Sequence, residues 1–165
     1  MAALREGTKA PDFSLPLIAG GMFSLQEALK RGSVMAAFFK ASCPVCQYAF
    51  PFFERLEKAY GSAKAAMVGI SQDNKIDTAA FVRQYGITFP VLLDDPAGHV
   101  VSNAYGLTTV PTWFIIAQNG EIMLSSVGWA RTDVEDLNRR MAEANYTAPR
   151  RLFRPGEGFP NFPTG

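Results

Sequence analysis

The sequence predicts an α/β fold with a central mixed β-sheet, helices on both faces and an N-terminal β-hairpin extension. The first observation is that residues 34–39 form a continuous apolar run of strand length, as in a strand buried on both faces. Apolar residues then recur at helical spacing from Phe50 to Tyr60, and Gly61 ends the pattern. Near the end of the chain, two short strand patterns flank an Asn119-Gly120 hairpin signal and precede a helix.

The remaining elements are assigned in chain order from the same signals. The Gly20-Gly21 pair predicts the turn of the N-terminal hairpin, and alternating strand and helix patterns follow the central run. The expected strands are residues 12–15, 22–25, 34–39, 66–71, 91–94, 112–117 and 122–127. The expected helices are residues 26–30, the stretch from Cys43 to Gly61, and residues 77–85, 99–105 and 132–145.

A chain of 165 residues fits one domain, which we assign to residues 1–146. Residues 147–165 contain four prolines and three arginines, a composition that excludes a regular helix or a central strand. We expect a disordered or loosely attached tail. The alternative is a partner-binding segment that uses Phe153, Phe159 and Phe162.

Composition and charge exclude several classes of function. The hydrophobic content of 48% and net charge of +1 are those of an ordinary globular chain with no general attraction for nucleic acid or anionic membranes. No apolar run approaches the ~20 residues that cross a bilayer, so we expect no membrane span. The first residues lack the apolar region of a secretory signal, which predicts a cytoplasmic protein, or a periplasmic one if a signal sequence was removed.

The two cysteines, Cys43 and Cys46, lie three residues apart, so no framework of structural disulfides can form. The spacing fits a redox-active pair, half of a zinc site or an inert buried pair. The single histidine, His99, lies far along the chain and is interpreted as a surface residue, so a zinc site would need a second subunit. A non-enzymatic metal-binding or partner-binding module therefore stays an alternative.

The predicted position of the pair, between a strand and a helix, indicates which thiol reacts. Cys43 is expected at the helix N-terminus, where unpaired N–H groups and the helix dipole favour a thiolate, whereas Cys46 is expected one turn inside. Pro44 suits the first helical position because it lacks an N–H group. Cys43 would attack a disulfide, and Cys46 would then resolve the mixed disulfide.

These segments resemble the thioredoxin superfamily. The strand at 34–39, the Cys43-Pro44-Val45-Cys46 motif and Pro51 match its active-site segment, and residues 110–112 match its cis-proline loop. Residues 10–15 and 68–73 are similar to the TlpA-like and AhpC/TSA redoxin branches. The resemblance covers about residues 7–145 and implies a thioredoxin fold and thiol-disulfide oxidoreductase activity.

The resemblance also implies the site and its partners. Pro111 would be cis and face the cysteines, and the backbone of Val110 would pair with an extended substrate flanked by Ser42 and Pro44. The partners would be a protein with a disulfide or dithiol and a separate reductant or oxidant protein, with no cofactor beyond the Cys43–Cys46 disulfide. Two family features are absent, because Ala37 replaces a buried acid and Ser42 replaces a tryptophan. Lys40 is a candidate electrostatic modulator of the Cys43 thiolate.

The main alternative is a peroxiredoxin-like thiol peroxidase, with Cys43 peroxidatic and Cys46 resolving. Such enzymes place Thr or Ser three residues before the reactive cysteine, where this chain has Lys40. Their arginine before the segment matching residues 112–114 is replaced by Val110-Pro111. The residues therefore favour disulfide exchange.

Overall fold

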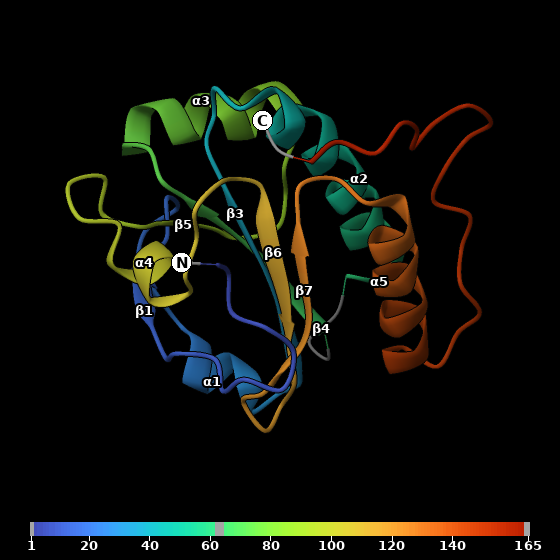
Figure 1. Ribbon diagram of the computed structural model, residues 1–165, viewed down its shortest axis with the longest axis horizontal. Coiled ribbons are helices and arrows are strands. Elements are labelled where there is room, and N and C mark those ends of the chain that lie inside the picture. The colour runs from blue at the N-terminus through green and yellow to red at the C-terminus, as the bar shows by residue number, and fades with distance from the viewer. Residues whose placement is uncertain (1, 62–64, 164–165) are drawn as a thin grey trace.

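The computed structural model describes residues 2–61 and 65–163 and confirms the predicted central mixed sheet (Figure 1). The sheet has the strand order β5-β4-β3-β6-β7, in which β3 is parallel to β4, β4 is parallel to β5, and β6 is antiparallel to β3 and β7. Its strands are β3 (Ser33–Phe39), β4 (Ala65–Ser71), β5 (Val91–Leu93), β6 (Thr112–Ile116) and β7 (Ile122–Val127).

The apolar run became the central strand because both faces of β3 are covered. Phe39 points to one face, where its ring lies 4.4 Å from that of Phe50 and 4.8 Å from that of Phe81. Phe38 points to the other face and packs on Tyr105 and Phe114. Side chains alternate along a strand, so an uninterrupted apolar run fits this position.

The helices are divided between the two faces, as predicted (Figure 1). The Phe39 face carries α2 (Pro44–Tyr60), α3 (Lys75–Tyr85) and α5 (Arg131–Ala144), and the Tyr60 hydroxyl of α2 donates a 2.5 Å hydrogen bond to Asn138 of α5. The opposite face carries the short helices α1 (Leu25–Leu29) and α4 (Val100–Ala104).

The predicted N-terminal hairpin is also present. Strands β1 (Ser14–Pro16) and β2 (Met22–Ser24) pair antiparallel as a separate two-stranded sheet. A bridge between Leu17 and Leu92 attaches this hairpin to the edge of the main sheet.

The expectation of a disordered or loosely attached tail is wrong for residues 150–163, which pack on α2 and α5. Leu152 and Phe153 are buried, and the Phe153 ring lies 5.1 Å from that of Phe52. The expectation rested on the prolines and arginines of this segment. The segment is docked because burial of the apolar pair at 152 and 153 stabilises it against α2 and α5. Phe162 is half-buried and only Phe159 is strongly exposed, at 65%. The division at residue 146 stays a prediction.

Candidate active site

Cys43 is the N-cap of α2, directly after the loop that leaves β3. Its Sγ accepts a 3.1 Å hydrogen bond from the N–H of Cys46, and Pro44 occupies the first helical turn. A capping group satisfies one of the N–H groups that a helix start leaves unpaired, and proline has no such group to satisfy. The residue types therefore explain why the helix begins here and why the Cys43 sulfur lies over its N-terminus.

Both thiols are buried, with exposed fractions of 5% for Cys43 and 0% for Cys46. Cys46 lies one turn inside the helix, as expected, but the two thiols differ little in exposure. Burial raises the pKa of the Cys46 thiol, and the hydrogen bond with the Cys43 side chain raises it further. Cys46 is therefore an uncharged thiol at neutral pH.

The loop before β6 lies against the cysteines. The Val110–Pro111 peptide bond is cis, as expected, and the Cys43 Sγ lies 3.7 Å from the carbonyl oxygen of Val110. Among the described residues, the N–H of Val110 donates no hydrogen bond. A free backbone donor next to a reactive sulfur can pair with an extended chain.

A cleft of ≈ 420 Å³ opens onto Cys43 on one side. Its walls come from the ends of the parallel strands β3, β4 and β5 and from the loop before Pro111, since the carboxyl ends of parallel strands meet at one edge of a sheet. The lining residues are mostly polar and comprise Lys40, Ser42, Cys43, Gln72, His99, Ser102, Asn103, Leu107, Thr108, Thr109 and Val110.

The far wall of the cleft is held by a buried carboxylate. Asp94, 1% exposed, accepts hydrogen bonds from the N–H and hydroxyl of Ser102, both at 2.7 Å. The Gln72 amide donates to the Ser102 hydroxyl at 3.0 Å, and the His99 ring lies 3.0 Å from the Gln72 carbonyl oxygen. Asp94 thus fixes this wall through Ser102.

Sequence analysis missed this wall and treated His99 as a surface residue, whereas it is half-buried beside the cleft. The available signal was positional. His99 and Gln72 each follow a predicted strand, and the carboxyl ends of strands that run parallel lie at the same sheet edge, here the one that carries Cys43.

The loop between β3 and α2 is held by a carboxylate that lies just after the neighbouring strand β4. Asp73 accepts a 2.6 Å hydrogen bond from the N–H of Ala41, and the Gln47 amide donates to the Ala41 carbonyl at 2.8 Å. Lys40 is exposed at the cleft and forms no ion pair with any described residue. Ser42 and Pro44 are exposed on either side of Cys43. The structure therefore groups all the sequence-predicted site residues at this edge.

Residues 2–61 and 65–163 contain neither a metal-ligating cluster nor a membrane-spanning helix. No group of three or more His, Cys, Asp or Glu side chains is placed to hold a metal ion. No helix in these ranges is long and apolar enough to cross a bilayer.

The chain is similar in sequence and in fold to thioredoxin-like and thiol-disulfide oxidoreductase proteins. The chain is 33% identical over 129 residues to thioredoxin-like protein YneN of Bacillus subtilis, covering 76% of this chain and 73% of that one. It is 30% identical over 125 residues to thiol-disulfide oxidoreductase ResA of Halalkalibacterium halodurans, covering 75% and 69%. A thiol:disulfide interchange protein of the thioredoxin family from Chlorobium tepidum superposes with a TM-score of 0.68 at 28% identity, covering 87% of this chain and 99% of that structure.

Fold, cysteine pair and relatives together define a thioredoxin-fold thiol-disulfide oxidoreductase. The AhpC/TSA family model matches residues 7–125. The chain belongs to the AhpC/TSA family.

Proposed function

We propose that Cys43 is the nucleophile of disulfide exchange and that Cys46 is the resolving thiol. The observation that carries this assignment is the position of Cys43 at the N-terminus of α2 and on the wall of the cleft, with Cys46 fully buried behind it. Positive charge at a helix N-terminus favours the thiolate of the outer cysteine.

The reaction follows two balanced steps. The Cys43 thiolate attacks one sulfur of a substrate disulfide, a Cys43–substrate disulfide forms, and the departing thiolate takes up a proton. Cys46 then loses its proton and attacks the Cys43 sulfur, which releases the second substrate thiol and leaves a Cys43–Cys46 disulfide. Two electrons have passed to the substrate, and the reverse sequence would oxidise a dithiol.

The residues around Cys43 support a role in holding the substrate. The free N–H of Val110 would pair with an extended segment of the substrate, and Pro111, Ser42 and Pro44 would line its path. The cation of Lys40, which pairs with no carboxylate in the described part of the chain, would favour the Cys43 thiolate during attack. A separate reductant or oxidant protein would restore the starting state of the pair. The compartment in which this happens stays a prediction.

A thiol peroxidase is less well supported by the cleft. Among the described residues that line it, none is an arginine, and the position three before Cys43 is Lys40. A peroxide would therefore lack the guanidinium that polarises its O–O bond in such enzymes.

The test is to remove the resolving thiol. Cys46→Ser should accumulate a covalent adduct with a disulfide-bonded protein on Cys43, because nothing then displaces the substrate. Mass spectrometry of the adduct and its peptide map gives the result. Cys43→Ser is the matched control and should form no adduct. If Cys46→Ser instead forms a sulfenic acid with low peroxide and no adduct with protein disulfides, the exchange assignment is wrong.

A further inference from the structure

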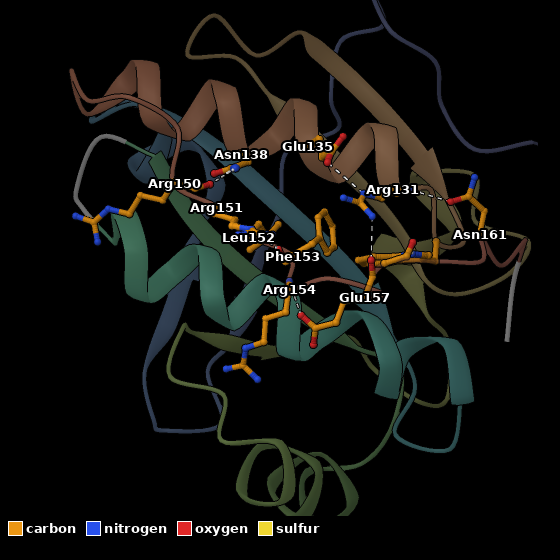
Figure 2. Close-up of polar contacts among 12 residues, drawn as sticks. Arg131, Glu135, Asn138, Arg150, Arg151, Leu152, Phe153, Arg154, Glu157 and Asn161 are labelled. Atoms are coloured by element: carbon orange, nitrogen blue, oxygen red, sulfur yellow. Dashed lines mark hydrogen bonds and ion pairs between the residues drawn. The ribbon is translucent and has the colours of Figure 1, made fainter.

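The C-terminal segment, residues 150–163, is anchored by charged and aromatic contacts (Figure 2). Arg55 of α2 forms two hydrogen bonds to the Glu157 carboxylate, at 2.8 and 3.0 Å. Arg131 donates to the Glu157 carbonyl at 2.9 Å, and its backbone N–H donates to Asn161 at 3.0 Å. Its guanidinium also lies 4.4 Å from the ring centres of both Phe153 and Phe159. The segment therefore has a defined path along α2 to the loop after β7.

The end of this segment pairs with the backbone of Trp129. The Trp129 N–H donates to the Phe162 carbonyl at 2.6 Å, and the Phe162 N–H donates to the Trp129 carbonyl at 2.9 Å, as in an antiparallel bridge. Gly128 has φ +77°, and a Cβ there would overlap the carbonyl oxygens of Phe162 and Pro163. The two backbones are thus in direct contact, with both pairing groups of Trp129 in use.

This bridge lies next to the site of exchange. The N–H of Gly128 donates a 2.8 Å hydrogen bond to the carbonyl of Pro111, whose neighbour Val110 contacts Cys43. The Phe162 ring also lies 5.3 Å from that of Tyr48, in the second turn of α2. One flank of the Cys43–Val110 pair is therefore closed by the chain's own C-terminal segment, and the other opens into the ≈ 420 Å³ cleft.

We infer that residues 161–163 block one end of the path along which an extended substrate would pair with Val110. Cys43 would then prefer a disulfide in a small molecule or near a chain end. An extended substrate that pairs with Val110 and continues past Pro111 would need the backbone groups of Trp129, and Phe162 already occupies them. A disulfide in the middle of a long extended segment would first have to displace the bridge. This inference rests on the proposed role of Cys43.

The test compares reagents of different length on Cys43 in a Cys46→Ser background, where each adduct persists. The small reagent is cysteamine activated as its 2-pyridyl disulfide, and the long reagent is a nine-residue extended peptide with the same group on a central cysteine. The Cys43 thiolate attacks the cysteine sulfur, a mixed disulfide forms, and pyridine-2-thione is released and measured by absorbance. Two further peptides carry the activated cysteine at the N-terminus and at the C-terminus, respectively.

The full chain should react about tenfold more slowly with the central-cysteine peptide than with the small reagent. One of the two terminal-cysteine peptides should react as fast as the small reagent. Deleting residues 161–165 should remove the difference, because the Trp129 backbone becomes free. Phe162→Pro, which removes the N–H that pairs with Trp129, should act in the same direction.

Phe159→Ala is the matched control, since it removes an exposed ring that contacts Arg131 but leaves both backbone hydrogen bonds of the bridge in place. It should keep the discrimination of the full chain. If the deletion and Phe162→Pro both leave the ratio of rates within about twofold of the full chain, the inference is wrong. The reagents need only a reactive thiol at Cys43. A failure of the proposed function would appear separately, as absent turnover of protein disulfides by the unaltered chain, which has both cysteines.

Discussion

The two cysteines differ little in exposure but clearly in their surroundings. Both are buried, yet only Cys43 caps a helix N-terminus and lines the cleft, whereas burial raises the pKa of Cys46. A raised thiol pKa means that the neutral form persists well above pH 7. The second step of exchange therefore depends on a rare thiolate.

This asymmetry predicts a pH dependence for resolution. Only the Cys46 thiolate attacks, and its fraction rises about tenfold per pH unit below the pKa of the group. The release of substrate from a preformed mixed disulfide on Cys43 should therefore accelerate about tenfold per pH unit, or about a hundredfold between about pH 7 and 9. Rapid acid quenching followed by mass spectrometry measures the rate. A flat profile over this range would show that Cys46 is already ionised.

The sequence allowed the residues around the cysteines to be predicted, but not those across the cleft. Cys43 and Pro44 lie in a local motif whose spacing identifies them, and the resemblance to the thioredoxin superfamily adds Pro111. Gln72, His99 and Ser102 come from separate strand ends and meet Cys43 only when β4 and β5 align with β3. In the sequence, the only sign of that meeting is that Gln72 and His99 follow predicted strands, which is a weaker signal than a local motif.

At the scale of elements, the long periodic patterns were predicted correctly and the ends of elements less well. The strand at 34–39 and the helix after Cys43 are confirmed, because an apolar run and a helical repeat are strong local signals. Helix α3 begins at Lys75 rather than residue 77, since the Asn74 side chain accepts a 2.8 Å hydrogen bond from the N–H of Asp77. The cap, rather than the apolar pattern, sets that boundary.

A buried carboxylate fixes α2 to the loop before β5. Glu54, 5% exposed, accepts hydrogen bonds from the N–H and hydroxyl of Thr88 at 2.8 and 2.6 Å. Glu54→Ala should lower the free energy of unfolding by about 1–3 kcal/mol, because the Thr88 donors lose their acceptor. Urea denaturation measures the loss.

The matched control for Glu54 is Glu143→Ala in α5, where the side chain is exposed. This change should alter the free energy of unfolding by less than about 0.5 kcal/mol. Equal losses for the two variants would show that the Thr88 contacts do not stabilise the packing of α2.

At the scale of the whole molecule, the C-terminal segment joins elements that the sheet alone leaves apart. Its residues contact α2 through Arg55, α5 through Asn138 and the loop after β7 through Trp129. Composition predicted the absence of regular structure here but not the docking. Docking depends on a few apolar residues finding partners far away in the chain, such as Phe153 with Phe52.

The ion pair between Arg55 and Glu157 predicts that the C-terminal segment detaches in acid before the core unfolds. The hydrogen bonds from Arg55 lower the pKa of Glu157 to about 2, below its ordinary value of 4.5. A lowered carboxyl pKa gives stabilisation that is present above 4.5 and is lost as the pH falls toward 2. Hydrogen exchange, corrected for intrinsic rates, should show protection of residues 147–163 falling between pH 5 and 2 while β3 stays protected.

The control for the acid response is Glu157→Gln. Its C-terminal segment should already exchange faster at pH 5 and should show little further change on acidification, because the titrating group is gone. A pH response equal to that of the unaltered chain would assign the loosening to another group.

The packing around Trp129 also gives the protein an internal optical probe. Its indole is 1% exposed, donates to the Gly158 carbonyl at 3.1 Å and lies among the rings of Tyr48, Phe52 and Phe153. The other tryptophan, Trp113, is buried in the sheet against Phe53. Indole emission shifts to longer wavelength in water. Of these two tryptophans, only Trp129 would therefore show such a shift when the C-terminal segment detaches. The fluorescence spectrum can therefore follow the flank of the active site in real time, without a label.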